Sequence, residues 1–145
     1  YLGGTWKGED YQRVLKTAKD RIPIVAPHIL IGVSDGLIKG EFYAIDMVAE
    51  GRVDCLAMLT LMDQYGTPKL DEVEKVMAYA REKVKVKLNL GCMRERGMVR
   101  LALEKLAIDL GYDGIANPTN EAIDYARSKG VEPVLAEDCC VFTPV

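Results

Sequence analysis

The chain has 145 residues, of which 49% are hydrophobic and 28% are charged, and its formal net charge is −3. This length suits one domain with a core of its own, and the slightly acidic balance gives no footprint for nucleic-acid binding. Since no apolar run reaches the roughly 18 residues of a membrane span and no signal peptide opens the chain, we expect a soluble cytoplasmic protein without a membrane partner.

The four cysteines do not form the pattern of a disulfide framework. Cys55 lies inside an apolar segment, and Cys139 and Cys140 are neighbours in the chain, where a bridge would be strained. We therefore expect reduced thiols, as in a cytoplasmic protein.

Apolar segments typical of buried parallel strands alternate along the chain with segments of helical spacing. A leading helix is expected within residues 1–22, where Val14, Leu15 and Ala18 share one face over residues 11–20. The expected strands cover residues 24–33, 53–62, 84–90 and 112–116, and the expected helices cover 40–49, 70–82, 98–110 and 117–129. A short fifth strand at 131–136, within a C-terminal tail of residues 131–145, is left open.

Strand starts recur about every 30 residues, which is the length of a βαβ unit with a right-handed crossover. Such repeats build either a doubly wound sheet or a (β/α)8 barrel. The sequence lacks a Gly-x-Gly-x-x-Gly turn after a strand, which weakens the case for a doubly wound dinucleotide-binding sheet. Four to five units amount to about half of a typical barrel of roughly 250 residues. We predict an α/β fold, one domain over residues 1–145, forming a half (β/α)8 barrel whose parallel strands lie in sequence order. Because natural proteins cover or pair open sheet edges, we expect that the chain is either a fragment or needs a partner, in a homo- or hetero-oligomer.

In both architectures ligands bind beyond the carboxyl ends of the strands, so the polar residues there are the candidates for a site. They are Ser34, Asp35, Lys39, Glu41, Thr60, Asp63, Gln64, Asn89, Cys92, Arg94, Arg96, Asn117, Thr119, Glu137, Asp138, Cys139 and Cys140.

The basic and glycine-rich positions among them each leave two interpretations open. Arg94 and Arg96 could clamp a carboxylate or phosphate, or they could pair with Glu95, Glu104 or a neighbouring loop. The glycines of segment 36–40 could let a backbone approach a ligand or could serve a turn.

Histidine and cysteine chemistry is similarly open. His28 is the only histidine, which excludes a multi-histidine metal site; it is either a core side chain or one that faces a ligand. Cys92 is either a soft-metal ligand or a free thiol, and Cys139 with Cys140 could be metal ligands, a redox pair or buried thiols. Asn117 stands before a helix that Thr119 is expected to cap.

A family resemblance rests on four segments and one pair of cysteines. They are residues 25–32, 36–41, 90–97 (Leu-Gly-Cys-Met-Arg-Glu-Arg-Gly) and 113–118, together with Cys139–Cys140. The chain resembles the C-terminal half of a radical S-adenosylmethionine enzyme of the biotin synthase and archaeal-type two-component lipoyl synthase family. The resemblance implies late barrel strands that build the S-adenosylmethionine and substrate walls, with the Gly-x-Ile-x-Gly segment from Gly36 to Gly40 beside the adenosyl group. It also implies that Arg94 matches an arginine that ligates an auxiliary cluster in biotin synthase.

Residues and resemblance together give a candidate set. The expected cofactor-binding residues are His28, Gly36, Ile38, Gly40, Glu41 and Asn117; the expected substrate-binding residues are Asn89, Arg94 and Arg96; the expected metal ligands are Cys92, Arg94, Cys139 and Cys140.

The sequence departs from the family in one motif, because it has no Cys-x3-Cys-x2-Cys to bind the [4Fe–4S] cluster. The expected function is therefore the C-terminal part of a sulfur-inserting enzyme that acts on a lipoyl or biotin precursor, inactive without a cluster-binding N-terminal half or partner subunit. The alternatives are a non-catalytic α/β subunit that completes a partner's barrel, or a barrel enzyme that binds a phosphorylated small molecule through Arg94 and Arg96.

Overall fold

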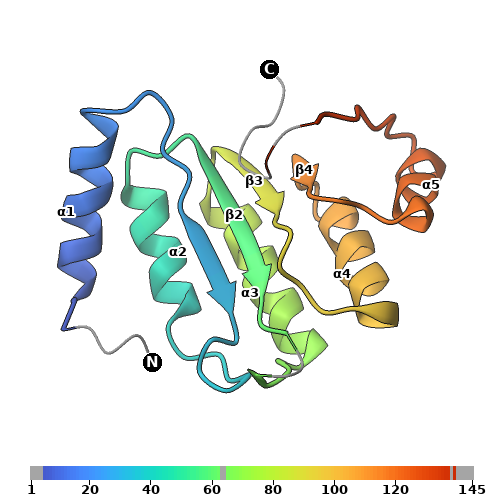
Figure 1. The fold of residues 1–145 in the computed structure, drawn as a ribbon, viewed down its shortest axis with the longest axis horizontal. Helices are drawn as coiled ribbons and strands as arrows, with labels where there is room; N and C mark the ends of the chain where they lie inside the picture. Colours follow the sequence, from blue (N-terminus) through green and yellow to red (C-terminus); the bar gives the residue numbers. More distant parts are fainter. Residues whose placement is uncertain (1–4, 63–64, 138, 140–145) are drawn as a thin grey trace.

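The protein is a four-stranded parallel sheet with five helices, seen in a computed structural model that describes residues 5–62, 65–137 and 139 (Figure 1). The elements alternate in chain order: α1 (Gly8–Lys19), β1 (His28–Ile31), α2 (Glu41–Glu50), β2 (Cys55–Thr60), α3 (Leu70–Lys83), β3 (Lys87–Leu90), α4 (Gly97–Asp109), β4 (Gly114–Ile115) and α5 (Asn120–Ser128).

The strands lie in the order β1-β2-β3-β4, and every neighbouring pair is parallel. The predicted α/β class and the predicted strand order are therefore confirmed. A sheet that never reverses its strand order places successive right-handed crossovers on one face, unlike a doubly wound sheet with helices on both.

The packing of the strands agrees with this one-sided arrangement. Alternate strand residues pack in a single core with α2, α3 and α4. These strand residues are Ile29, Ile31, Leu56, Met58, Leu88 and Leu90, and their partners include Ile45, Val76, Met77, Leu103 and Ala107. Figure 1 looks onto the other face, which no helix of the described chain covers.

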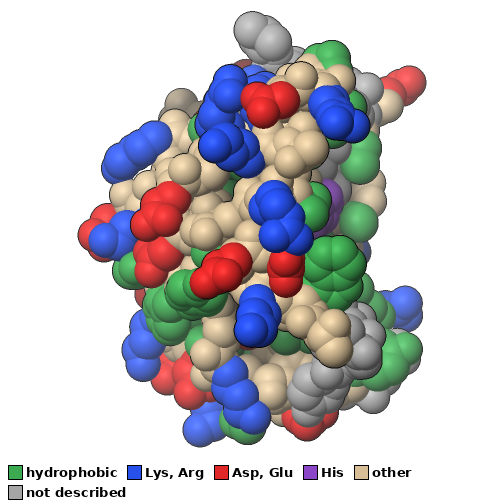
Figure 2. All heavy atoms as spheres, turned by 90° about the vertical axis from the view of Figure 1, so that its left-hand side faces the viewer, with side chains coloured by type: hydrophobic (Ala, Val, Ile, Leu, Met, Phe, Trp, Pro, Cys, Tyr) green, Lys and Arg blue, Asp and Glu red, His purple; other side chains and the backbone are tan. Residues whose placement is uncertain are grey.

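Helix α1 lies at the β1 end of the sheet and has no buried residue, although Leu15 and Ala18 pack against the core. Its first turn is closed by Asp10, which accepts a hydrogen bond from the Lys7 backbone nitrogen at 2.9 Å. The side of the molecule that α1 forms carries acidic, basic and hydrophobic side chains intermixed (Figure 2).

The strands are shorter than the sequence predicts, for identifiable reasons. Pro27 has no N–H for the ladder, so β1 begins at His28, and Gly32 with φ of +81° turns the chain away after Ile31. The open alternative of a fifth strand at 131–136 is wrong, because those residues form no strand, and Val134 and Leu135 are 81% and 77% exposed. None of the described helices is both long and apolar enough to cross a membrane.

Candidate functional site at the carboxyl edge of the sheet

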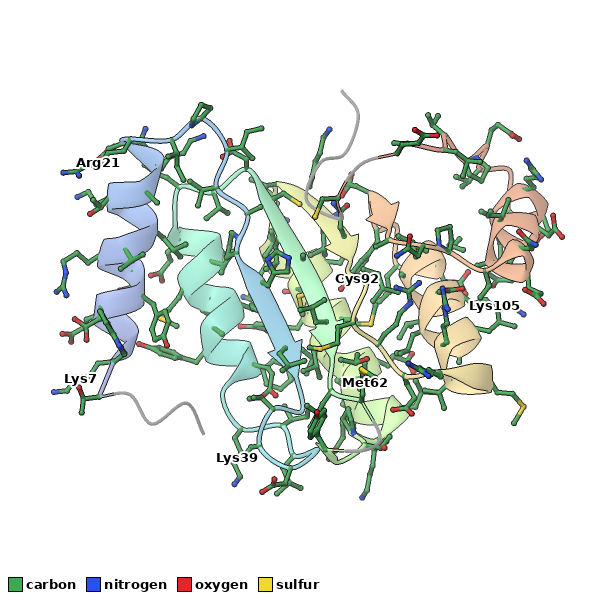
Figure 3. The ribbon with its side chains drawn as sticks, viewed as in Figure 1. Lys7, Arg21, Lys39, Met62, Cys92 and Lys105 are labelled. Carbon is green, nitrogen blue, oxygen red and sulfur yellow. The ribbon has the colours of Figure 1, made fainter. Side chains whose placement is uncertain are left out.

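The loops that follow the four parallel strands meet at one edge of the sheet, where the sequence placed the candidate residues. In Figure 3, Lys39 marks the loop after β1, Met62 the end of β2 and Cys92 the loop after β3. Two backbone hydrogen bonds join these connections: the nitrogen of Leu61 donates to Ile31 and that of Thr60 to Met93.

The loop after β1 is held closed by the carboxylate of Glu41, which is only 4% exposed. Its Oε1 accepts a hydrogen bond from the Gly32 nitrogen at 2.8 Å, and its Oε2 accepts from Lys39 at 2.8 Å and Gly40 at 2.9 Å. Both oxygens of this expected cofactor-binding residue therefore serve the loop itself.

The two glycines of the Gly-x-Ile-x-Gly segment have different surroundings. Gly36 has φ of +80°, and a Cβ there would lie 2.9 Å from the Thr67 carbonyl oxygen, so this glycine is needed for close loop packing. A Cβ on Gly40 would meet nothing within 4 Å. Ile38 packs against the core, which leaves Gly40 as the position where a ligand could approach this backbone.

Arg94 is a buried hub that joins β3, α4 and the chain after β4. Its Nη1 donates to the Gly91 carbonyl at 2.7 Å, and its Nη2 donates to Glu104 Oε1 at 2.6 Å, to Ala116 O at 2.7 Å and to Asn117 O at 3.0 Å. Pairing with Glu104 was one of the alternatives that the sequence left open, and it is the one seen here. The expected carboxylate, phosphate or cluster contact would require Arg94 to leave these partners.

Glu104 completes this network and is fully buried. Its Oε1 also accepts from Arg100 Nε at 2.9 Å, and its Oε2 accepts from the nitrogen and hydroxyl of Thr119 at 3.0 and 2.5 Å. Burial alone raises the pKa of Glu104, but the hydrogen bonds from Thr119, Arg94 and Arg100 outweigh it and lower the pKa below its usual value. Thr119 also caps α5 by accepting from Ala122, as predicted.

A small cleft beside this hub lies between the end of β2 and the starts of α3 and α4. Its walls include Thr60, Leu61, Leu70, Glu95, Val99 and Leu103, and its interior holds about 10 Å³. Glu95 is 9% exposed and Thr60 is 2% exposed. Glu95 Oε2 and Thr60 Oγ1 are buried without a hydrogen-bond partner in the described chain. The sequence suggested Glu95 only as a partner for an arginine. A buried carboxylate without a partner produces no pattern of residue spacing by which the sequence could reveal it.

The helix-free face carries a second group of residues, brought to one level by the strand register. His28, Ala57, Asn89 and Gly114 lie in a row across β1 to β4. Asn89 Nδ2 donates to Cys55 Sγ at 3.4 Å, and a Cβ on Gly114 would lie 2.8 Å from Asn89 Oδ1. His28 is exposed on this face, with Nδ1 3.1 Å from the Ala26 carbonyl oxygen, so its interpretation as a buried core histidine is wrong.

The remaining candidates are more scattered. Arg96 and Asn117 are exposed at the carboxyl edge, and Arg96 forms no ion pair or hydrogen bond with the part of the chain that the structure describes. Cys92 is an exposed free thiol and Cys139 is also exposed, whereas Cys140 lies outside the described residues, as do Asp63, Gln64 and Asp138.

The described residues do not fit a cluster site. Over residues 5–62, 65–137 and 139, no three His, Cys, Asp or Glu side chains gather as a metal-binding group. Arg94 is also occupied by its internal partners. A cluster that uses Cys92, Cys139 or Cys140 would therefore need further ligands from outside the described residues.

Comparison of the chain with protein-family models, with curated proteins and with solved structures finds no match.

Proposed function

We propose that the chain is the C-terminal part of a radical S-adenosylmethionine-type barrel, which forms cofactor and substrate walls for a cluster-binding half. The substrate would be a lipoyl or biotin precursor or a related small molecule. The observation that carries the proposal is the one-sided sheet: four sequential parallel strands with helices on one face only. A barrel wall has this construction, with its helix-free face turned to the interior.

The row on the helix-free face supports this assignment. His28 and Asn89 are polar, while Ala57 and Gly114 at the same level have little or no side chain. In a closed barrel this row would line the lumen, where small residues leave room and polar residues orient a ligand.

The loop after β1 supports the placement of S-adenosylmethionine. Glu41 and Gly36 give this loop one fixed shape, and the space around Gly40 allows a flat ring to approach the backbone. S-adenosylmethionine would supply the radical when a partner's cluster cleaves it. This chain would bind and orient it through His28 and the backbone at Gly40, while Ile38 anchors the loop to the core.

The two other functions differ in what supports them. A non-catalytic subunit that completes a partner's barrel uses the same one-sided sheet and differs only in whether cofactor is bound. A phosphate-binding barrel enzyme has less support, because Arg94 is engaged by Glu104 and by three carbonyl groups. Of the two arginines in that alternative, Arg94 and Arg96, only Arg96 is exposed.

The experiment is anaerobic co-purification of the chain with a partner that carries Cys-x3-Cys-x2-Cys. Iron, acid-labile sulfide and S-adenosylmethionine binding are measured for the chain alone and for the complex. We expect a loaded cluster and cofactor cleavage only in the complex. His28→Ala should weaken cofactor binding without lowering Tm, and Lys16→Ala, at an exposed position of α1, is its control. A complex that binds no S-adenosylmethionine would instead identify the chain as a non-catalytic subunit.

A further inference from the structure

Glu95 is a carboxylate that the fold buries without giving it a partner. It is 9% exposed, its Oε2 is inaccessible, and no ion pair or hydrogen bond joins it to the described part of the chain. An ionised carboxylate with one oxygen buried in this way is destabilising unless something donates to that oxygen. Native proteins hold few groups of this kind, and an ion, a water or a ligand commonly accounts for them.

A second unpartnered oxygen belongs to a residue that lines the same cleft. Thr60 is 2% exposed and its Oγ1 has no hydrogen-bond partner within the described residues. Thr60 belongs to β2 and Glu95 to the loop after β3, so the parallel arrangement of the strands brings both to one place. A hydroxyl and a carboxylate together form an acceptor set for a group that carries several N–H donors.

The size and lining of the cleft restrict the ligand further. Its interior of about 10 Å³ has room for one water-sized group. The other walls are largely apolar, with Leu61, Val99 and Leu103 among them. The charge of Glu95 disfavours anions. A divalent metal would require more oxygen ligands than the cleft offers, and no metal-binding group of three occurs among the described residues.

We propose that the cleft formed by Thr60, Glu95, Val99 and Leu103 binds the ammonium head of a primary amine, which donates hydrogen bonds to Glu95 Oε2 and Thr60 Oγ1. The apolar walls then contact the carbon atoms next to the nitrogen. Thr60 shares the helix-covered side of the sheet with its register partner Ile31. The amine site is therefore separate from the row of His28 and Asn89, and it does not rest on the proposed function.

The test is a titration of the isotope-labelled full chain with methylammonium chloride, followed by NMR of the methyl groups of Thr60, Val99 and Leu103. We expect saturable shifts of these signals. Tetramethylammonium, with the same charge and no N–H, and methanol, with no charge, should leave them unshifted. Unsaturable shifts, or equal shifts with tetramethylammonium, would show that the cleft holds ordered water only.

Matched variants identify the acceptors. Glu95→Gln should weaken methylammonium binding at least tenfold, since a charge-assisted hydrogen bond is lost. Glu74→Gln, at an exposed position of α3, removes the same charge and should bind like the wild type. Thr60→Val keeps the side-chain shape and should weaken binding severalfold, which provides a second measurement should Glu95→Gln fail to fold. Wild-type affinity in Glu95→Gln, or in Thr60→Val where Glu95→Gln is unfolded, would overturn the assignment.

Discussion

The guanidinium of Arg94 and the carboxylate of Glu104 form an ion pair 2.6 Å long, in which the two side chains are 2% and 0% exposed. The pair connects the loop after β3 to α4, and its further hydrogen bonds reach the chain after β4. An arginine that the sequence offered as a ligand for substrate or cluster therefore holds the carboxyl edge together.

Replacing Arg94 with Ala should destabilise the protein by about 3–5 kcal/mol, because it leaves the buried carboxylate of Glu104 with one cation fewer. Arg94→Lys should recover only a small part, since one ammonium cannot reach acceptors on Gly91, Glu104 and Ala116 together. Urea unfolding at neutral pH measures both. Wild-type stability in Arg94→Ala would instead favour the ligand-binding role.

Glu104 should make stability depend on acid pH. Burial raises its pKa, but hydrogen bonds from Thr119, Arg94 and Arg100 lower it below the ordinary 4.5. The stabilisation is therefore present at pH values above about 4.5, where the carboxyl is ionised in both the folded and unfolded states. It is lost as the pH falls through the lower folded-state value.

The measurement is the free energy of unfolding of the wild type and of Glu104→Gln between pH 7 and pH 2.5. The variant should be less stable at pH 7, and the gap should narrow towards low pH. Glu121→Gln, which removes an exposed carboxylate in the first turn of α5, is the control and should follow the wild-type curve. A gap that stays constant with pH would contradict the lowered pKa.

Gly36 and Gly40 should respond differently to replacement by Ala. Gly36→Ala combines a φ of +80° with a Cβ 2.9 Å from the Thr67 carbonyl oxygen, so we expect a loss of about 2 kcal/mol or more. Gly40→Ala has a φ of −131° and open space, so Tm should hardly change. On the proposed function, Gly40→Ala should nevertheless weaken S-adenosylmethionine binding by the assembled complex. Unchanged binding would remove Gly40 from the cofactor wall.

The chain alone should self-associate, because the outer edges of β1 and β4 have no neighbouring strand in the described sheet. Exposed apolar side chains near β1 add to this tendency: Val14, Ile22 and Ile24 are each about half exposed. Both signs of charge are intermixed on the α1 side, so no net repulsion opposes contact there (Figure 2). Sedimentation velocity over a concentration series tests this, and a monomer at every concentration with a cooperative melt would contradict it.

The sequence was sufficient for the order of the strands but not for the partners of individual side chains. Apolar runs at regular intervals predicted four parallel strands, and short connections favour the pairing of strands that follow one another in the chain. The ends of those strands were overestimated, since Val25 is apolar and buried yet lies outside the ladder. The apolar character of a residue indicates that it is buried, but not whether its backbone belongs to a strand.

The site shows the same limit. Thr119 was predicted as a helix cap because capping is a local relationship within four residues. The packing of α4 against the loop after β3 determines that Arg94 pairs with Glu104. The same packing buries Glu95 Oε2 without a partner in the described chain. No spacing in the sequence encodes that packing. For the same reason, the sequence could not show whether His28 is exposed or buried.

The one-sided sheet also has a consequence for how the chain folds. Each strand pairs with the strand one unit earlier or later, so every closure involves a loop of similar and modest length, and none joins the first strand to the last. Such a topology has no late, long-range step, and assembly can begin at the central pair β2–β3 and grow outward by accretion. On the proposed function, the same kinetics would let this half of a barrel form early, with only the docking of its two outer strands left for the encounter with a partner.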